Sequence, residues 1–350
     1  MTRITSVTEG LARIEAHTSD KISKKLPVFY NPDMRFNRDV TVLLLNCVEQ
    51  KPRVMVDLMA GSGIRTIRFL KELDQDQIKK IYVNDANPNA IESIRHNVHL
   101  NQCSEEKIEY SNKTADQLLT STPMADYIDI DPFGSPNPFL DLAIKKLKGK
   151  DGILAVTATD TAPLCGTYVK ACQRKYWAKP IRDSQKHEWA ARILIRKVQL
   201  IGAQYDKALI PICSIAKLHF LRIFFISVRG KKAVDELIIP NHQYVHDAGP
   251  FWTGQLQQKD LIEKMCKKAP EDMKKFMDIL LEESRIDVVG FTDLHKIAKE
   301  TKMALPKYEK IINKLRSMGY QASRTIFSEE GVRTTADKEK IKKIMLDLSH

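Results

Sequence analysis

No stretch of this 350-residue chain approaches the roughly 18 consecutive apolar residues that a membrane-spanning helix needs. Its first residues, MTRITSVTEGLARIEAH, lack the apolar core of a secretory signal peptide. The six cysteines are scattered without a CxxC pair, which argues against a disulfide framework and against a thiolate zinc site. We therefore expect a cytoplasmic protein without a membrane partner and without a metal. The oligomeric state stays open, with a monomer favoured.

Two phosphate-binding sequences are also missing. The chain contains neither the G-x-G-x-x-G of dinucleotide-binding folds nor the G-K-[ST] of a P-loop. Their absence argues against a dinucleotide or a nucleoside triphosphate as the ligand.

Positive charge, by contrast, is in excess, and it is concentrated. The formal net charge is +12, and residues 140–232 alone hold 19 Lys and Arg against 6 Asp and Glu, a surplus of 13. A basic surface of this kind suits a phosphate-rich partner, and Tyr176 and Trp177 inside the stretch offer rings that can stack on bases. The alternative interpretation is a basic face that only keeps the protein soluble.

Strand and helix patterns alternate from residue 53 onward, which predicts an α/β fold with an open, mostly parallel, seven-stranded sheet. Residues 1–30 look like an irregular basic arm, so the first predicted domain spans residues 1–232. Residues 233–350 are highly charged and mostly helical, which predicts a smaller α+β domain, and 291–320 resembles winged-helix packing. The seven runs typical of strands are 53–58, 80–85, 107–112, 126–131, 152–159, 208–213 and 218–228.

Acids and glycines follow the first two predicted strands. Asp57 ends the first strand, Gly61 and Gly63 lie in the loop behind it, and Asp85 follows the second strand, 28 residues after Asp57. Ligands of open α/β sheets bind beyond the carboxyl ends of the strands, where glycines let the backbone approach and an acid accepts ribose hydroxyls. The alternative role for Asp85 is to cap the helix that opens at Pro88. A ribose acid without a phosphate motif fits a nucleoside such as S-adenosylmethionine.

The pattern D-x-x-A-G-S-G, which begins at Asp57, is similar to the first motif of class I methyltransferases. This resemblance implies a Rossmann-like sheet and S-adenosylmethionine as the cofactor. A nicotinamide dehydrogenase is the runner-up, but it would need the pyrophosphate-binding glycines that are absent.

A second candidate site lies at the end of the strand predicted over 126–131, where the chain reads DPFG. Asp131 offers a carboxylate and Pro132 a rigid carbonyl, and both can hold the N–H groups of a base amino group so that its lone pair becomes available. Phe133 can stack on the base. Positioning of this kind needs no metal. The alternative interpretation is a plain turn with a packed Phe133.

Six motifs in order, from VFYNPDMRFNRD through DLMAGSGIR, DIDPFGSP, TATDTAPLCG and KHEWAARIL to RTIFSEEGVRTTA, resemble the archaeal and eukaryotic tRNA (guanine-26-N2) dimethyltransferases. The resemblance spans about residues 28–336. It implies methyl transfer from S-adenosylmethionine to tRNA, a catalytic first domain and a tRNA-binding second domain. It matches Arg38, Arg65, Asp85 and Ala86 to cofactor contacts, Asp131 to the catalytic acid and Phe29 to an aromatic near the target base.

The chain departs from that family at two places. Thr114 and Ala115 stand where the family usually has Asp-Ala beside the adenine, which puts the hydrogen bond of Thr114 in doubt. Many members carry four cysteines before a GPLW segment, whereas HQYVHDAGPFWTG has only His242 and His246, so we expect no zinc. Two alternatives stay open: methylation of another nucleic-acid amino group, and a tRNA-binding protein with a vestigial cofactor pocket.

Overall fold

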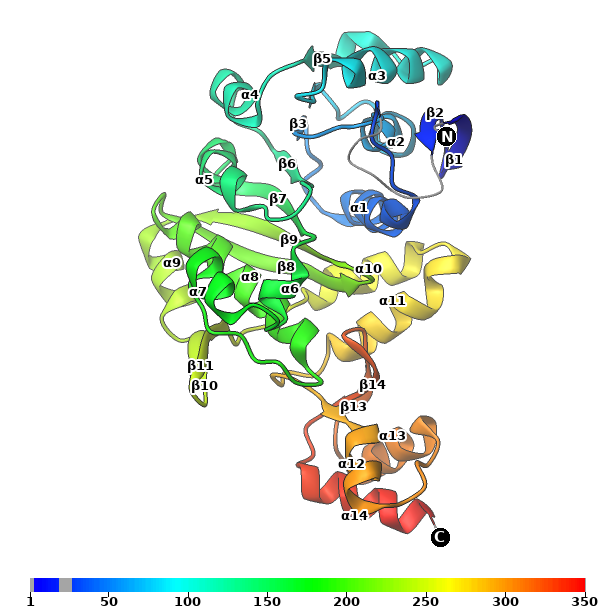
Figure 1. Ribbon diagram of the computed structural model, residues 1–350, viewed down its shortest axis with the longest axis vertical. Coiled ribbons are helices and arrows are strands. Elements are labelled where there is room, and N and C mark those ends of the chain that lie inside the picture. Colours follow the sequence, from blue (N-terminus) through cyan, green and yellow to red (C-terminus); the bar gives the residue numbers. More distant parts are fainter. Residues whose placement is uncertain (1–2, 19–26, 350) are drawn as a thin grey trace. The chain divides into compact units, whose positions relative to one another are not determined.

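The computed structural model describes residues 3–18 and 27–349, and Figure 1 shows them coloured along the chain. A seven-stranded sheet has the order β5-β4-β3-β6-β7-β9-β8, and β5, β4, β3, β6 and β7 pair in parallel. The predicted α/β class with a mostly parallel seven-stranded sheet is therefore confirmed. The strands are β3 (Val54–Asp57), β4 (Lys80–Asn84), β5 (Ile108–Ser111), β6 (Tyr127–Ile130), β7 (Lys150–Ala158), β8 (Lys207–Lys217) and β9 (Phe220–Arg229).

The strand order reverses beside β3, because the chain leaves β3 for β4 on one side and returns to β6 on the other. Such a reversal opens a crevice at the carboxyl ends of the two central strands. The helices that follow the strands begin at local signals: Asn87 caps α3 with Pro88 in its first turn, and Thr114 and Gln117 form a capping box on α4. Helix α1 (Arg35–Cys47) precedes the sheet, and the helices that follow its strands are α2 (Ile64–Glu72), α3 (Pro88–Leu100), α4 (Ala115–Ser121) and α5 (Asn137–Lys146).

The expected irregular arm over residues 1–30 is wrong for its first half. Strands β1 (Arg3–Glu9) and β2 (Ala12–Thr18) form an antiparallel hairpin that contacts α2 and α3 (Figure 1). The alternating apolar residues of β2, Ala12, Ile14 and Ala16, are buried against those helices, a period-two pattern that the prediction overlooked. Residues 19–26 of the expected arm lie outside the described residues.

The chain divides by its contacts into two compact units. One comprises the residues up to Thr159 with Val198–Ile210 and Phe224–Glu236, and the other comprises Asp160–Lys197, Pro211–Ile223 and the residues from Leu237. This division differs from the single boundary expected after residue 232. The two expected domains, residues 1–232 and 233–350, stay a prediction. The remaining helices up to residue 283 are α6 (Thr161–Leu164), α7 (Val169–Tyr176), α8 (Lys186–Ala203), α9 (Lys231–Ile238), α10 (Lys259–Lys268) and α11 (Glu271–Glu283).

The C-terminal segment has a core of its own, in which Leu294, Ile311, Leu315, Val332 and Ile341 are fully buried. Its three-stranded sheet has the order β12-β14-β13. The segment runs strand, two helices, β-hairpin and helix, and the winged-helix packing expected for 291–320 stays a prediction. The elements are β12 (Thr292–Asp293), α12 (Leu294–Thr301), α13 (Tyr308–Ser317), β13 (Ala322–Thr325), β14 (Ser328–Thr334) and α14 (Lys338–Ser349).

The two candidate histidines lie in a hairpin that the sequence did not predict, formed by β10 (His242–Val245) and β11 (Ala248–Trp252). His242 is the first residue of β10, and His246 lies in the turn between the strands. In the part of the chain that the structure describes, no three His, Cys, Asp or Glu side chains are grouped so that they could hold a metal ion. Within residues 3–18 and 27–349, no helix combines the length and the apolar character needed to cross a membrane.

Candidate active site

A cavity of about 230 Å³ opens where β3, β4 and β6 end, at the reversal of strand order beside β3. Segment 29–38, the loop after β3 and the DPFG turn supply most of its walls. Parallel strands place their carboxyl ends on one edge, so motifs far apart in sequence meet there. The candidate residues that the cavity brings together are Phe29, Arg38, Asp57, Gly61, Arg65, Asp85, Ala86, Asp131, Pro132 and Phe133.

Asp85 fastens the loop after β3 to the loop after β4. Its Oδ2 accepts a hydrogen bond from the Gly61 amide at 2.8 Å, and its Oδ1 accepts one from the Asn87 amide at 2.9 Å. The alternative role of Asp85 as the cap of α3 is wrong, because Asn87 caps that helix and Asp85 bonds, at the start of α3, only the amide of the cap residue. Each carboxylate oxygen has a second lone pair, so Asp85 can still accept hydrogen bonds from a ligand in the cavity.

The backbone conformation at position 61 and the close approach of another main chain both require a glycine there. The φ of Gly61 is +54°, and a Cβ atom there would lie 2.9 Å from the carbonyl oxygen of Phe29. We expect Gly61→Ala to lower the free energy of unfolding by about 1–2 kcal/mol for the left-handed conformation and by about 1–3 kcal/mol more for the backbone contact. Gly319→Ala is the matched control for urea denaturation, because Gly319 has φ +85° and nothing within 4 Å of its Cβ position. Equal losses for the two variants would contradict the contact.

Arg65 holds several carboxylates together behind the cavity. Its guanidinium forms ion pairs with Asp131 through Nη2 and with Asp129 through Nη1 at 3.2 Å, and it also donates to Asn37. Burial would lower the pKa of Arg65, but the charges of Asp129 and Asp131 outweigh that effect and raise it. Burial raises the pKa of Asp57 to about 6, although Arg65 opposes the shift. One guanidinium therefore faces more than one negative charge, which favours a cationic ligand.

Asp131 and its neighbours present unused acceptors and an aromatic ring to the cavity. Arg65 takes Oδ2 of Asp131, and no described residue donates to Oδ1 or to the carbonyl oxygen of Pro132. Phe133 is 48% exposed and meets Phe29 edge to face, with ring centroids 4.2 Å apart. The turn is fixed from behind, because the Gly134 amide donates to Thr159 Oγ1 at 2.6 Å. These groups suit a flat ligand that carries N–H donors.

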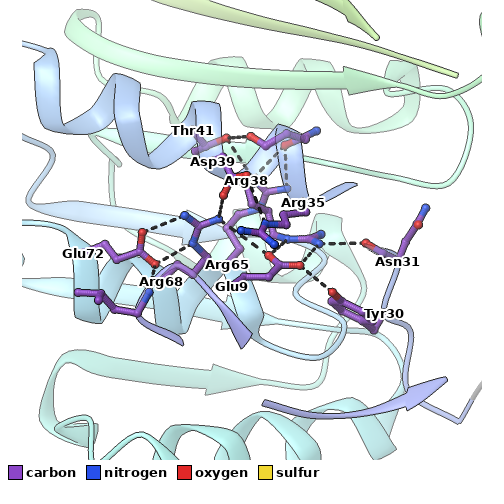
Figure 2. Close-up of polar contacts among 12 residues, drawn as sticks. Glu9, Tyr30, Asn31, Arg35, Arg38, Asp39, Thr41, Arg65, Arg68 and Glu72 are labelled. Atoms are coloured by element: carbon purple, nitrogen blue, oxygen red, sulfur yellow. Dashed lines mark hydrogen bonds and ion pairs between the residues drawn. The ribbon is translucent and has the colours of Figure 1, made fainter. Parts of the chain in front are cut away.

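The N-terminal hairpin contributes Glu9, which sequence reasoning missed. Glu9 is buried and accepts two hydrogen bonds from Arg38, at 2.7 Å from Nε and 2.6 Å from Nη2, and one from the Tyr30 hydroxyl at 2.7 Å (Figure 2). Nη2 of Arg38 also donates to the Asn31 carbonyl, and no described residue uses Nη1. Burial alone would raise the pKa of Glu9, but Arg38 and Tyr30 lower it below its usual value, so Glu9 stays ionised. Arg38 is thereby fixed at the cavity wall with both N–H groups of Nη1 unused by described residues.

The same network ties the hairpin to α2, as Figure 2 shows. Arg68 of α2 donates to Asp39 and, at 2.8 and 2.9 Å, to both oxygens of Glu72. Glu72 in turn accepts a hydrogen bond from the Leu11 amide at the hairpin turn. The cavity wall therefore depends on a segment that precedes the predicted sheet.

Three candidate residues lie outside the cavity lining. Gly63 starts α2 and packs against Ile94 of α3, where a Cβ would lie 3.0 Å from the Ile94 side chain. Thr114 uses its side chain to cap α4, and Ala115 is the first residue of that helix. Their contact with an adenine stays a prediction. Further lining residues that sequence reasoning missed are Tyr30, Asn31, Met34, Met59, Ala60, Ser62, Ile64 and Thr159.

Comparisons with known proteins agree along nearly the whole chain. A family model described as N2,N2-dimethylguanosine tRNA methyltransferase matches residues 10–245 and 239–346. The chain is 36% identical to the tRNA (guanine(26)-N(2)/guanine(27)-N(2))-dimethyltransferase of Aquifex aeolicus, over 98% of this chain and 96% of that one. It is 36% identical to the tRNA (guanine(26)-N(2))-dimethyltransferase of Methanocaldococcus jannaschii, over 94% and 95%. Trm1 from Pyrococcus horikoshii, solved with S-adenosyl-L-methionine, superposes with a TM-score of 0.87 at 33% identity, covering 98% of this chain and 100% of that one.

Proposed function

Because the chain belongs to the family of N2,N2-dimethylguanosine tRNA methyltransferases, we propose that it transfers methyl groups from S-adenosyl-L-methionine to the exocyclic N2 of guanine 26 in tRNA, giving N2,N2-dimethylguanosine. The observation that carries the proposal is the meeting of Asp131 and Pro132, with unused acceptors, and the Phe29–Phe133 pair at a cavity lined by Asp85 and Arg38.

The cavity fits S-adenosyl-L-methionine through the chemistry of its lining. Asp85 keeps acceptor capacity for ribose hydroxyls, and Nη1 of Arg38 is a donor suited to a carboxylate. The carboxylates of Asp57 and Asp131 suit a positively charged sulfonium. When bound, this molecule supplies an electrophilic methyl group.

The chain's own residues would then orient the target base. The lone pair of a guanine amino group is delocalised into the ring, so the group is a poor nucleophile until its N–H bonds are held. Oδ1 of Asp131 and the Pro132 carbonyl are the acceptors for those bonds, and Asp131 receives the proton that the nitrogen loses. Arg65 acts as a positioning residue, because its bond to Oδ2 fixes the plane of the carboxylate. Phe133 and Phe29 hold the plane of a base that has left its stack.

Asp85→Asn tests the ribose contact. The variant keeps the shape but loses the charge, and we expect the dissociation constant for S-adenosylhomocysteine to rise about 10- to 100-fold, since hydrogen bonds to charged groups contribute about 1.5–3 kcal/mol. Isothermal titration calorimetry measures the change. Asp116→Asn, at an exposed position on α4 outside the cavity, is the control and should bind as the wild type does. Unchanged binding by Asp85→Asn would show that Asp85 is only structural.

The overall proposal is tested with purified protein, labelled S-adenosyl-L-methionine and unmodified tRNA, followed by mass spectrometry of the nucleosides. We expect N2,N2-dimethylguanosine, and its loss when guanine 26 is replaced by adenine in the transcript. Methylation of DNA or ribosomal RNA but not of tRNA would instead support the alternative, an enzyme for another nucleic-acid amino group.

The location and the assembly of the protein also belong to this proposal. We place it in the cytoplasm as a monomer, with residues 233–350 contributing to tRNA binding. Exposed lysines of α12, α13 and α14 support that last role, because the phosphate backbone dominates nucleic-acid affinity.

A further inference from the structure

One aromatic ring stands exposed among cations in the unit that contains α7 and the first turns of α8. Trp177 ends α7 in a left-handed conformation, with φ +57°, and is 47% exposed. The Nζ of Lys197 lies 2.8 Å from the centre of its ring, and Nη1 of Arg196 donates to its carbonyl oxygen at 3.1 Å. Lys197 of α8 therefore lies against the indole, and Arg196 of α8 holds the main chain of the same residue.

The cations around this ring lack acidic partners. No described carboxylate forms an ion pair with Lys170, Arg174, Arg196 or Lys197. Lys197 is only 5% exposed, and burial together with Arg196 lowers its pKa to about 8, so it stays mostly protonated at pH 7. Nε of Arg196 is buried without a hydrogen-bond partner. Positive charge without neutralisation at a partly buried place indicates that an anionic group completes it.

The remaining members extend the surface in two directions. Lys170 and Arg174 are exposed and lie four residues apart on one face of α7, and Trp177 caps the end of that helix. Tyr244 of β10 is 67% exposed and lies near Arg196. Burial lowers the pKa of Arg196, and Tyr244 opposes part of that shift. The β10–β11 hairpin is joined to the segment directly after Trp177, because the main chains of Lys179 and Gly249 exchange two hydrogen bonds of 2.8 Å.

The sequence analysis predicted that the rings of both Tyr176 and Trp177 are available to stack on bases. This prediction is wrong for Tyr176. Its side chain is fully buried, and its hydroxyl donates to Asp160 at 2.5 Å. Trp177 alone remains available from that pair. We call the surface made of Lys170, Arg174, Trp177, Arg196, Lys197 and Tyr244 the Trp177 patch.

We propose that the Trp177 patch binds an unpaired nucleotide of the tRNA outside the active-site cavity, with the base stacked on Trp177 and the flanking phosphates held by Arg196, Lys170 and Arg174. This inference rests on the proposed function for the identity of the RNA. Stacking on an indole backed by a cation suits any base, and phosphates supply the charge that the patch lacks. The patch therefore positions the tRNA without reading its sequence.

Trp177→Ala is the central test, with binding to unmodified tRNA measured by fluorescence anisotropy at fixed salt. We expect the dissociation constant to rise about 5- to 100-fold, the range for loss of one stacked base, and the loss to appear in the KM for tRNA. Binding of S-adenosylhomocysteine should match the wild type. The double variant Lys170→Ala, Arg174→Ala should reduce the slope of log K against log salt by about 1.4, or about 0.7 per phosphate contact.

Direct contact is checked by intrinsic fluorescence. The other two tryptophans, Trp189 and Trp252, are buried, so quenching by tRNA should come from Trp177 and should disappear in Trp177→Phe. Lys232→Ala removes an exposed lysine that pairs with Glu236 and is the control expected to retain tRNA affinity and activity. Thermal unfolding of each variant separates contact from misfolding.

The outcomes distinguish this inference from the proposed function. If Trp177→Ala and Trp177→Phe bind tRNA and show quenching as the wild-type protein does, the proposed nucleotide site at the Trp177 patch is excluded. The proposed function is unaffected by that result. Wild-type protein that binds no tRNA overturns both. Weaker binding with an unchanged melting temperature and lost quenching supports the stacked nucleotide.

Discussion

Asp131→Asn is expected to lower the kcat of methyl transfer by about 10²- to 10⁴-fold, the range for loss of a positioned acid–base group. The variant keeps the size of the side chain. It loses the negative charge, and its single acceptor oxygen cannot take the place of Oδ2 toward Arg65 and of Oδ1 toward a guanine amino group at the same time. The proton released from nitrogen then has no carboxylate to receive it. Affinity for S-adenosylhomocysteine should change far less than kcat, because Asp85 and Arg38 remain.

Single-turnover methyl transfer at saturating tRNA measures this effect without product release. Asp129→Asn is an informative comparison, since Asp129 also pairs with Arg65 but does not line the cavity. We expect less than a tenfold loss of kcat for Asp129→Asn in protein that remains folded at the assay temperature. If Asp131→Asn retained more than a tenth of the wild-type kcat, the proton-accepting role would be excluded.

The sequence was sufficient to predict that Asp57, Asp85 and Asp131 meet. Each follows a run typical of a buried strand, and the parallel arrangement places all three strand ends on one edge. Phe133 was predicted from the DPFG turn itself and Phe29 only through the resemblance, and nothing in either local pattern shows that their rings lie 4.2 Å apart.

Glu9 could not be predicted, for a physical reason. Its bond to Arg38 joins residues 29 apart, and it forms only because the hairpin folds back onto α2 and α3. An acid in an exposed-looking segment gives no local signal of burial, whereas the alternation in β2 did give one and was missed. Asp129 is an intermediate case, since a carboxylate inside an otherwise apolar strand indicates a buried partner, here Arg65.

Two motifs that carried the family resemblance have a structural explanation that their sequences do not reveal. KHEWAARIL contains Glu188 and Arg192, and RTIFSEEGVRTTA contains Arg333. Glu188 accepts from Arg192 Nε at 2.9 Å and from Arg333 Nη2 at 2.7 Å, and all three residues are buried. Glu188 and Arg333 are 145 residues apart, so the ion pair joins α8 to β14. Recognisable motifs are therefore not all parts of the cavity.

Glu188→Gln is expected to lower the free energy of unfolding by about 3–5 kcal/mol, the cost of removing one partner from a buried ion pair. The change leaves Arg192 and Arg333 buried without their shared carboxylate. The Gly290 amide donates to Glu188 Oε1 at 2.8 Å. In the glutamine variant it keeps an acceptor only in the side-chain orientation that points the amide oxygen, and not the NH2 group, at Gly290. Burial opposes ionisation of Glu188, but the two arginines lower its pKa to about 2, so the charge is present throughout the neutral range. Urea denaturation at pH 7 measures the loss of free energy of unfolding. In thermal unfolding we expect the melting temperature to fall on the order of 10 °C.

Glu283→Gln is the matched control, because this second buried glutamate lies beside Arg333 with the opposite shift. Burial raises the pKa of Glu283 to about 7 from a usual value of 4.5, and its Oε1 has no hydrogen-bond partner. Since the folded state binds this proton more tightly than the unfolded chain, the contribution of Glu283 to stability falls as pH rises from about 4.5 to about 7. Glutamine mimics the protonated form, so Glu283→Gln should cost less than about 1 kcal/mol at pH 5 and should stabilise the protein relative to wild type at pH 8. Equal destabilisation by both substitutions at every pH would show that the two arginines depend on total negative charge and not on the bonds of Glu188.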